Sequence, residues 1–234
     1  MLAFFFGFYD QINWPFHYFF TAFFLVAAVL FWWLDRKRGG DFRTEAQKLG
    51  LSYRVTFDPD LSESLRELRT LGNTTIPEDT PMVVGNGEEN PSAMFDVNFR
   101  ANGPTLARRF LLCFTTRVPE RLPELLVVPE SIDDSIREMV GSERLYVADD
   151  WVNGHFRVAC RDREFLDRLM SGEMPAFLQR HPTSLIEVRN RRVLLAREVP
   201  FQPQTLVADM DAGVQMVALL KGAADTPRRS GKNR

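Results

Sequence analysis

The stretch SAMFDVNFRANGPTLARRFLLCFTT, residues 92–116, decides the fold class of this chain. Apolar side chains occupy every second position from Ala93 to Phe99, which is typical of a strand with one face in water. The ANGP segment at 101–104 predicts a turn, and 107–116 has the composition of a more buried strand that returns beside the first. The stretch therefore predicts an antiparallel β-hairpin.

Strand and helix patterns alternate irregularly along the rest of the chain. Further strands are predicted at 51–57, at 124–128, at 155–160 and in a hairpin over 184–198. Helices are predicted at 41–50 with Asp41 as N-cap and Gly50 as stop, at 58–72 with Asp60 as N-cap, and at 129–141, 162–170, 174–181 and 203–220. This order indicates an α+β fold with a mixed, mainly antiparallel sheet and flanking helices.

The overall composition is that of a globular protein. The chain has 234 residues, a net charge of −2, 45% hydrophobic and 26% charged residues. A nearly neutral chain gives no argument for a nucleic-acid partner. Two cysteines are too few for a disulfide framework, and they lack the spacing of metal ligands.

Residues 11–34 contain no Asp, Glu, Lys or Arg. As a helix they would extend roughly 36 Å, which exceeds a bilayer core of about 30 Å. Trp14 lies near one end, and Trp32 and Trp33 lie at the other, where interfacial aromatic residues are favoured. A single transmembrane helix is therefore predicted over 11–34. A buried core helix would carry a polar stripe, and a cleaved signal peptide would carry positive charge before the apolar segment.

The basic residues Arg36, Lys37 and Arg38 directly follow this segment. The positive-inside rule then places the N-terminus outside the cell membrane and the C-terminal domain in the cytoplasm. The predicted organisation is an outer interfacial N-terminus at 1–10, the span, a basic hinge at 35–40, one α+β domain at 41–220 with lobes 41–128 and 129–220, and a disordered basic tail at 221–234.

Several segments occur in a familiar order. WWLDRKRGG is followed by YRVTFDPDL, then by LLVVPESIDDSIREMVG and HFRVACRDREFLDRLMSGEMPAFLQRHP. In this order the chain resembles a loose group of uncharacterised bacterial membrane-anchored proteins, in which a short transmembrane region precedes a cytoplasmic α+β domain. The acidic GNGEENPSAMFDVNF departs from the basic, tyrosine-containing middle of that group. The resemblance implies fold and topology, and it assigns no catalytic residue.

Catalytic signals are weak. Three histidines, His17, His155 and His181, give little material for a zinc site or a triad. Cys113 and Cys160 lie among strand residues, which favours small buried side chains over nucleophiles. The G-x-G at 85–87 lacks the remainder of a phosphate-binding loop. We therefore predict no catalytic residue, no metal and no cofactor.

Two short segments are candidates for a contact surface. Trp151 follows Asp149 and Asp150 in a polar segment, and such an aromatic residue is either a contact residue or part of a solvated turn. In the second segment, arginines form either a site for an anion or lipid headgroup or a charged hairpin tip. These are Arg189, Arg191 and Arg192.

The predicted function is a membrane-tethered cytoplasmic interaction or regulatory module, which binds a protein partner or the anionic membrane surface. Two alternatives stay open. One is a membrane-anchored hydrolase or transferase whose site is assembled from residues distant in sequence. The other is an accessory subunit of a membrane complex. Membrane lipid and a protein are the expected partners, and whether the chain is an enzyme stays undecided.

Overall fold

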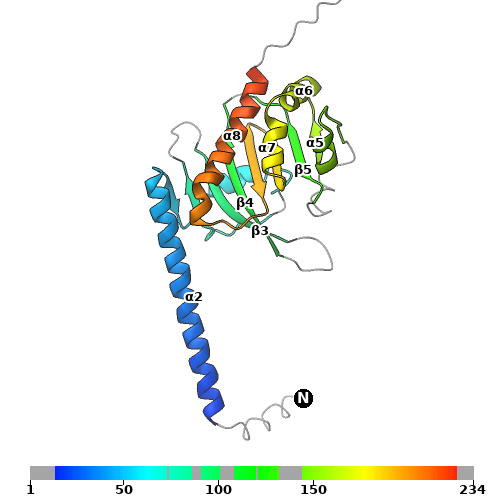
Figure 1. Ribbon diagram of the computed structural model, residues 1–234. Helices are drawn as coiled ribbons and strands as arrows, with labels where there is room; N and C mark the ends of the chain where they lie inside the picture. The colour runs from blue at the N-terminus through cyan, green and yellow to red at the C-terminus, as the bar shows by residue number, and fades with distance from the viewer. Residues whose placement is uncertain are drawn as a thin grey trace, which may run out of the picture. The chain divides into compact units, whose positions relative to one another are not determined.

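The computed structural model describes residues 14–72, 74–85, 91–100, 108–119, 121–131 and 144–225. The chain divides into two compact units, Met1–Thr44 and Glu45–Arg234. The first contains most of a long helix, α2 (Trp14–Lys48), and the second contains a β-sheet with its helices (Figure 1).

The second unit is built on an eight-stranded sheet with strand order β1-β2-β3-β4-β8-β7-β5-β6. The strands are β1 (Ser52–Arg54), β2 (Met82–Val84), β3 (Ala93–Arg100), β4 (Arg108–Arg117), β5 (Leu125–Pro129), β6 (Phe156–Cys160), β7 (Ser184–Arg189) and β8 (Arg192–Arg197). Every pairing between neighbouring described strands is antiparallel. The α+β class and the antiparallel sheet are confirmed, whereas the described strands include no parallel pair of a mixed sheet.

The hairpin predicted over 92–116 forms the interior of this sheet. β3 pairs with β4 from Ala93 opposite Thr115 to Arg100 opposite Arg108, and the other edge of β4 pairs with β8. β4 is thus an internal strand, and its residues Leu111, Leu112 and Cys113 are all at most 2% exposed. Because both faces of the strand are covered, its sequence is continuously apolar rather than alternating.

One face of the sheet, which we call face A, carries Phe95, Cys113 and Leu194. It is covered by α3 (Pro59–Leu65) and the segment that follows, from which Leu68 packs into the same buried cluster. The rings of Phe57 and Phe95 meet edge to face at 4.9 Å. This face therefore places the segment after α3 directly over the central strands.

The opposite face is covered by the C-terminal helices, which lie together in Figure 1. The other helices among the described residues are α5 (Asp150–His155), α6 (Arg163–Ser171), α7 (Met174–Arg180), the 3₁₀ helix η2 (Pro203–Thr205) and α8 (Leu206–Asp225). α8 contacts β4 and β8, and a Cβ added at Gly213 would overlap the ring of Phe114. Glycine at this position therefore allows the helix backbone to approach the β4 ring closely.

The N-terminal helix differs from the prediction. Within the residues that the structure describes, we find no helix with both the length and the apolar character needed to cross a bilayer. The transmembrane helix predicted over 11–34 is therefore wrong, and the single-pass membrane assignment is wrong with it. α2 also does not end at Leu34, where the prediction ended the span, but continues through Asp35 and the basic residues to Lys48.

The predicted orientation of the chain across the membrane, and the anchoring role predicted for the residues that flank the span, both depended on that transmembrane helix. Gly39 and Gly40 lie inside α2, so the helix start predicted at Asp41 is also wrong. The predicted stop is confirmed, because α2 ends at Lys48 and Gly50 has a φ of 68°. Glycine adopts this left-handed conformation at helix ends without strain.

Two other local predictions need correction. The N-cap of α3 is Asp58 rather than Asp60, and its side chain accepts hydrogen bonds from the amides of Asp60 and Leu61. Pro59 explains the shift, because proline suits the first helical position. The polar segment around Trp151 is the helix α5 rather than a turn.

Some predictions concern residues that the structure does not describe. These are the outer interfacial segment predicted at 1–10 and the part of the helix predicted at 129–141 that begins at residue 132. The tail predicted from 221 is not described from 226 onward, and α8 continues into this segment as far as Asp225.

Candidate functional site: an arginine-rich end of the sheet

Three adjacent strands each contribute an arginine to one end of face A. Arg192 on β8 lies opposite Arg117 on β4 and opposite Arg189 on β7. Since side chains two residues apart share a face, all three lie on the side of Leu194. We call Arg117, Arg192 and Arg189 the arginine row. Like charges directly opposite each other weaken a sheet, and Glu67 acts against this repulsion at Arg192.

The β7–β8 turn fixes the register of the row. Asn190 and Arg191 have φ values of 48° and 63°, and two residues with positive φ are characteristic of a type I′ hairpin turn. Asparagine tolerates this conformation better than most residues. The Asn190 side-chain amide also donates a hydrogen bond to Glu67 at 3.1 Å. The hairpin predicted from the sequence is confirmed, and it sets Arg189 beside Arg192.

Burial perturbs the centre of the row. It lowers the pKa of the Arg192 guanidinium, the neighbouring Arg117 lowers it further, and Glu67 acts in the opposite direction. Arginine nevertheless remains charged at neutral pH. A partly desolvated cation attracts an anion more strongly than an exposed one does, because water screens the interaction less.

A groove of about 350 Å³ lies beside Arg117 and Arg192. Its walls include Leu61 of α3 and Val84 of β2, so it combines apolar surface with the cationic end. The carboxylates of Asp58 and Asp60 also line it, and that of Asp58 caps α3 and lies 3.6 Å from Arg54. The negative charge of Asp58 is thereby partly offset.

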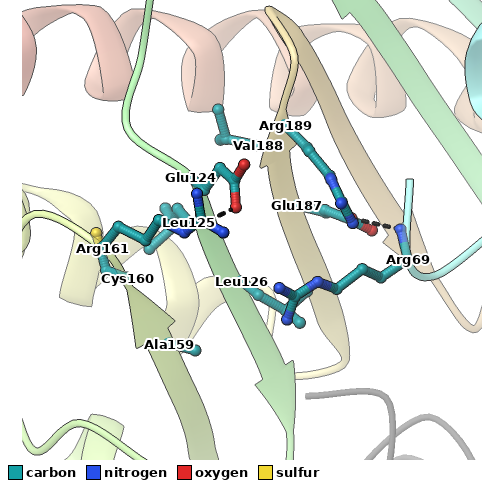
Figure 2. Close-up of a pocket in the computed structure, with 10 residues that line it drawn as sticks. All are labelled: Arg69, Glu124, Leu125, Leu126, Ala159, Cys160, Arg161, Glu187, Val188 and Arg189. Atoms are coloured by element: carbon teal, nitrogen blue, oxygen red, sulfur yellow. Dashed lines mark hydrogen bonds and ion pairs between the residues drawn. The ribbon is translucent and has the colours of Figure 1, made fainter. Parts of the chain in front are cut away.

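A smaller cavity of about 190 Å³ is lined by Arg189 and Glu187 of β7 (Figure 2). Glu187 is 2% exposed and accepts three hydrogen bonds, from the Arg69 amide at 2.6 Å, the Thr70 amide at 3.0 Å and the Thr70 hydroxyl at 2.6 Å. A buried carboxylate is costly unless donors satisfy it, and these donors do so. The bonds fix the segment after α3 over the sheet.

A second carboxylate lines the same cavity. Glu124 forms an ion pair with Arg161 at 3.2 Å, and the Arg161 amide donates a hydrogen bond to the Glu124 carbonyl oxygen at 3.2 Å. Arg69 reaches the cavity from the segment after α3, where Figure 2 shows its side chain near Leu126. Three arginines from distant parts of the sequence therefore line one small cavity.

The sequence candidates around Trp151 lie elsewhere. Asp149 is the N-cap of α5 and accepts a hydrogen bond from the Val152 amide at 2.9 Å, while Asp150 begins the helix. The rings of Trp151 and His155 are stacked, with their centres 4.2 Å apart. α5 leads into the Phe156 end of β6, whereas the opposite end of β6 borders the small cavity. The structure thus does not bring these residues to the arginine row.

The structure places the other residues that the sequence predicted for a contact surface or a membrane flank as follows. Arg189 and Arg192 belong to the row, and Arg191 is exposed in the turn between them. Trp32 and Trp33 are exposed on α2, and Nζ of Lys37 lies 5.4 Å from the centre of the Trp33 ring. The structure does not describe the side chains of Trp14, Arg36 and Arg38, which belong to α2.

Burial shifts the pKa values of the residues that were considered as nucleophiles or bases, Cys113, Cys160 and His181. Burial, with a smaller effect of Asp96, raises the pKa of the Cys113 thiol, and burial also raises the pKa of Cys160. Both thiols are therefore poor nucleophiles at neutral pH. Burial, followed by Arg197 and Arg180, lowers the pKa of His181. Within the described ranges, no group of three His, Cys, Asp or Glu residues is placed to hold a metal ion.

Reasoning from the sequence missed Arg117, Arg69 and Glu187. A signal for Glu187 exists, because it lies in the otherwise apolar SLIEV segment and shares its face with Leu185. Arg117 ends a strand that was predicted, yet only the β4–β8 register places it beside Arg192. No local pattern indicates that Arg69 meets β7.

Comparison with known proteins gives one informative likeness. No protein-family model matches the chain, and no curated protein matches it. The chain is similar in structure to the crystal structure of the mycobacterial trehalose monomycolate transport factor A, TtfA, with a TM-score of 0.53 and 14% sequence identity. The likeness covers 81% of this chain and 96% of that chain. At this identity it supports the fold alone.

Proposed function

We propose that this chain is a non-catalytic interaction module that binds an acidic segment of a partner protein at the groove beside Arg117 and Arg192. The observation that carries the proposal is the arginine row, in which cations from three strands are held opposite one another. Features that a protein retains against its own stability are concentrated at functional sites. A bound anion would relieve the repulsion within the row.

The composition of the groove favours a polypeptide ligand. Leu61 and Val84 offer apolar surface, and Arg117 and Arg192 offer guanidinium groups at one end. An acidic segment with an apolar side chain would use both features. Arginine suits this role because its planar guanidinium group can hold a carboxylate through two parallel hydrogen bonds.

TtfA, to which this chain is similar in structure, is by name a transport factor. The proposal takes neither the ligand nor the process of that protein, and it rests on the arginine row.

A fluorescence anisotropy titration of the purified full-length chain with a labelled poly-glutamate peptide tests this proposal. We expect saturable binding that weakens with added salt, and no binding of poly-lysine. Arg192→Gln should weaken binding about tenfold, which corresponds to about 1.4 kcal/mol.

Arg163→Gln is the matched control. Arg163 is an exposed arginine on α6 that pairs with Asp167 at 3.0 Å, so its loss should leave the affinity unchanged. Equal losses in both variants would indicate a general charge effect and contradict the proposal. Absence of any binding by the unmodified chain would contradict it as well.

A further inference from the structure

The small cavity on face A has more positive charge than its own carboxylates offset. Arg69, Arg161 and Arg189 line it together with Glu124 and Glu187 (Figure 2). Glu124 is paired with Arg161 at 3.2 Å. Glu187 is held by the amide of Arg69 and by Thr70, which satisfies its carboxylate with neutral donors.

The lining has a net charge of +1, three arginines against two glutamates, because neutral donors leave the negative charge of Glu187 in place. Within the part of the chain that the structure describes, neither the Arg69 nor the Arg189 side chain takes part in an ion pair. Both come from segments that the Glu187 hydrogen bonds hold together, so their backbones are fixed relative to each other. The Arg69 side chain is exposed, so its guanidinium group orders when the anion binds.

Arg189 provides the second, independent observation. Its Nε atom is buried and has no hydrogen-bond partner among the described residues. An unsatisfied buried N–H group is costly, and a bound ion or water is a common explanation for one. An oxygen atom of a ligand in the cavity would supply the missing acceptor.

The size and donor set of the cavity indicate the kind of anion. At about 190 Å³ it has room for a compact group together with water, since each liquid water occupies about 30 Å³. Guanidinium groups that approach from two separate segments need an acceptor with oxygens in several directions. A phosphate group provides these, whereas the two oxygens of a carboxylate lie in one plane.

We infer that this cavity binds a phosphate group through the guanidinium groups of Arg69 and Arg189. The site is separate from the groove of the proposed function, because the two share no lining residue. Arg189 also belongs to the arginine row, so Arg69→Gln and Arg192→Gln, which each affect one site only, distinguish the failure of one proposal from the failure of the other. The phosphate can be free or esterified in a small molecule, and the test separates these sources.

Isothermal titration of the full-length chain with inorganic phosphate, and separately with glycerol 3-phosphate, tests the inference. Sodium chloride at equal ionic strength is the reference. We expect saturable binding of at least one phosphate compound and none of chloride. Tighter binding of inorganic phosphate would indicate a free-phosphate site, and tighter binding of glycerol 3-phosphate would indicate a site for phosphate esters.

Variants then locate the site. Arg69→Gln and Arg189→Gln should each weaken phosphate binding about tenfold, whereas Arg192→Gln in the groove and Arg163→Gln on α6 should leave it unchanged. Arg189→Lys keeps the charge but removes the Nε donor, so it should also weaken binding. Urea unfolding midpoints of the variants would show that each is folded.

Three results would overturn the inference. One is that neither phosphate compound binds. Another is that Arg189→Lys binds phosphate as well as the unmodified chain, because the buried Nε would then have no role. The third is that Arg163→Gln weakens binding as much as Arg189→Gln, which would indicate general charge attraction.

Discussion

The Glu187 carboxylate accepts hydrogen bonds from both the backbone amide and the hydroxyl group of Thr70, a residue 117 positions earlier in the chain. The two distances are 3.0 and 2.6 Å. A strand residue thereby fixes the segment after α3 over face A. The position of Arg69, whose amide also donates to Glu187, depends on this contact.

Glu187→Gln should destabilise the fold by about 2 kcal/mol, because hydrogen bonds to a charged acceptor contribute about 1.5–3 kcal/mol. The glutamine NH₂ group would face a donor at one of the three bonds. Urea unfolding measures the change. Glu63→Gln, an exposed position on α3, should change the free energy of unfolding by less than about 0.5 kcal/mol. Equal effects of the two substitutions would show that the Thr70 contact contributes little.

Gly213→Ala should destabilise the protein by about 1–3 kcal/mol, because the new methyl group would overlap the Phe114 ring. Gly222→Ala is the matched control in the same helix, since nothing lies within 4 Å of its added Cβ. Alanine favours helix over glycine, so the control should gain up to about 1 kcal/mol. Thermal unfolding of both variants checks the pair, and a stabilised Gly213→Ala variant would contradict the packing of α8 on β4.

Arg197→Met should destabilise the fold by about 3–5 kcal/mol, because it leaves the buried Asp209 carboxylate without its cation. The side chains of the pair are 13% and 7% exposed. Asp209→Asn in the Arg197→Met background should recover part of this loss. The exposed Arg163–Asp167 pair is the control, and Arg163→Met should cost at most about 1 kcal/mol. A double-mutant cycle by urea unfolding gives both coupling energies.

The free energy of unfolding should fall as the pH is lowered through about 6.5, the ordinary pKa of histidine. Burial and the charges of Arg197 and Arg180 lower the pKa of His181 in the folded chain, and Asp209 opposes them. The unfolded chain therefore takes up the proton first. The full stability is present above the unfolded pKa and is lost as the pH falls toward the folded one.

Urea titrations between about pH 8 and about pH 5 would show this slope, because the window stays above the ordinary carboxylate pKa values. His181→Gln should flatten the profile. An unchanged slope in that variant would assign the pH dependence to another group.

Local patterns predicted much of the sheet. Alternation in β3, the apolar run of β4 and the turn residues of the β7–β8 hairpin are short-range signals, and the structure confirms the strands and the hairpins. The face of β3 that was predicted to lie in water does not, because Met94 is fully buried and Asp96 is half-buried. The helices α6 and α8 were equally predictable, because the capping residue Asp162 and the apolar periodicity lie within the segments themselves.

The predicted boundaries of the N-terminal helix were wrong for a physical reason. The prediction ended one helix at Leu34 and began another at Asp41, yet α2 continues through the charged residues to Lys48. The glycines at 39 and 40 do not interrupt the helix. Glycine weakens a helix by only about 1 kcal/mol, which is too little to determine a boundary by itself.

The sequence by itself determined the α+β class, the hairpins and most of the caps, because these depend on residues within a few positions of one another. Only the tertiary structure decided the sheet order, the arginine row and the cavity. Arg117 meets Arg192, and Glu187 meets Thr70, through strand register and packing between segments far apart in the chain. No short-range pattern encodes such contacts, since burial against distant segments selects them only when the whole sheet assembles.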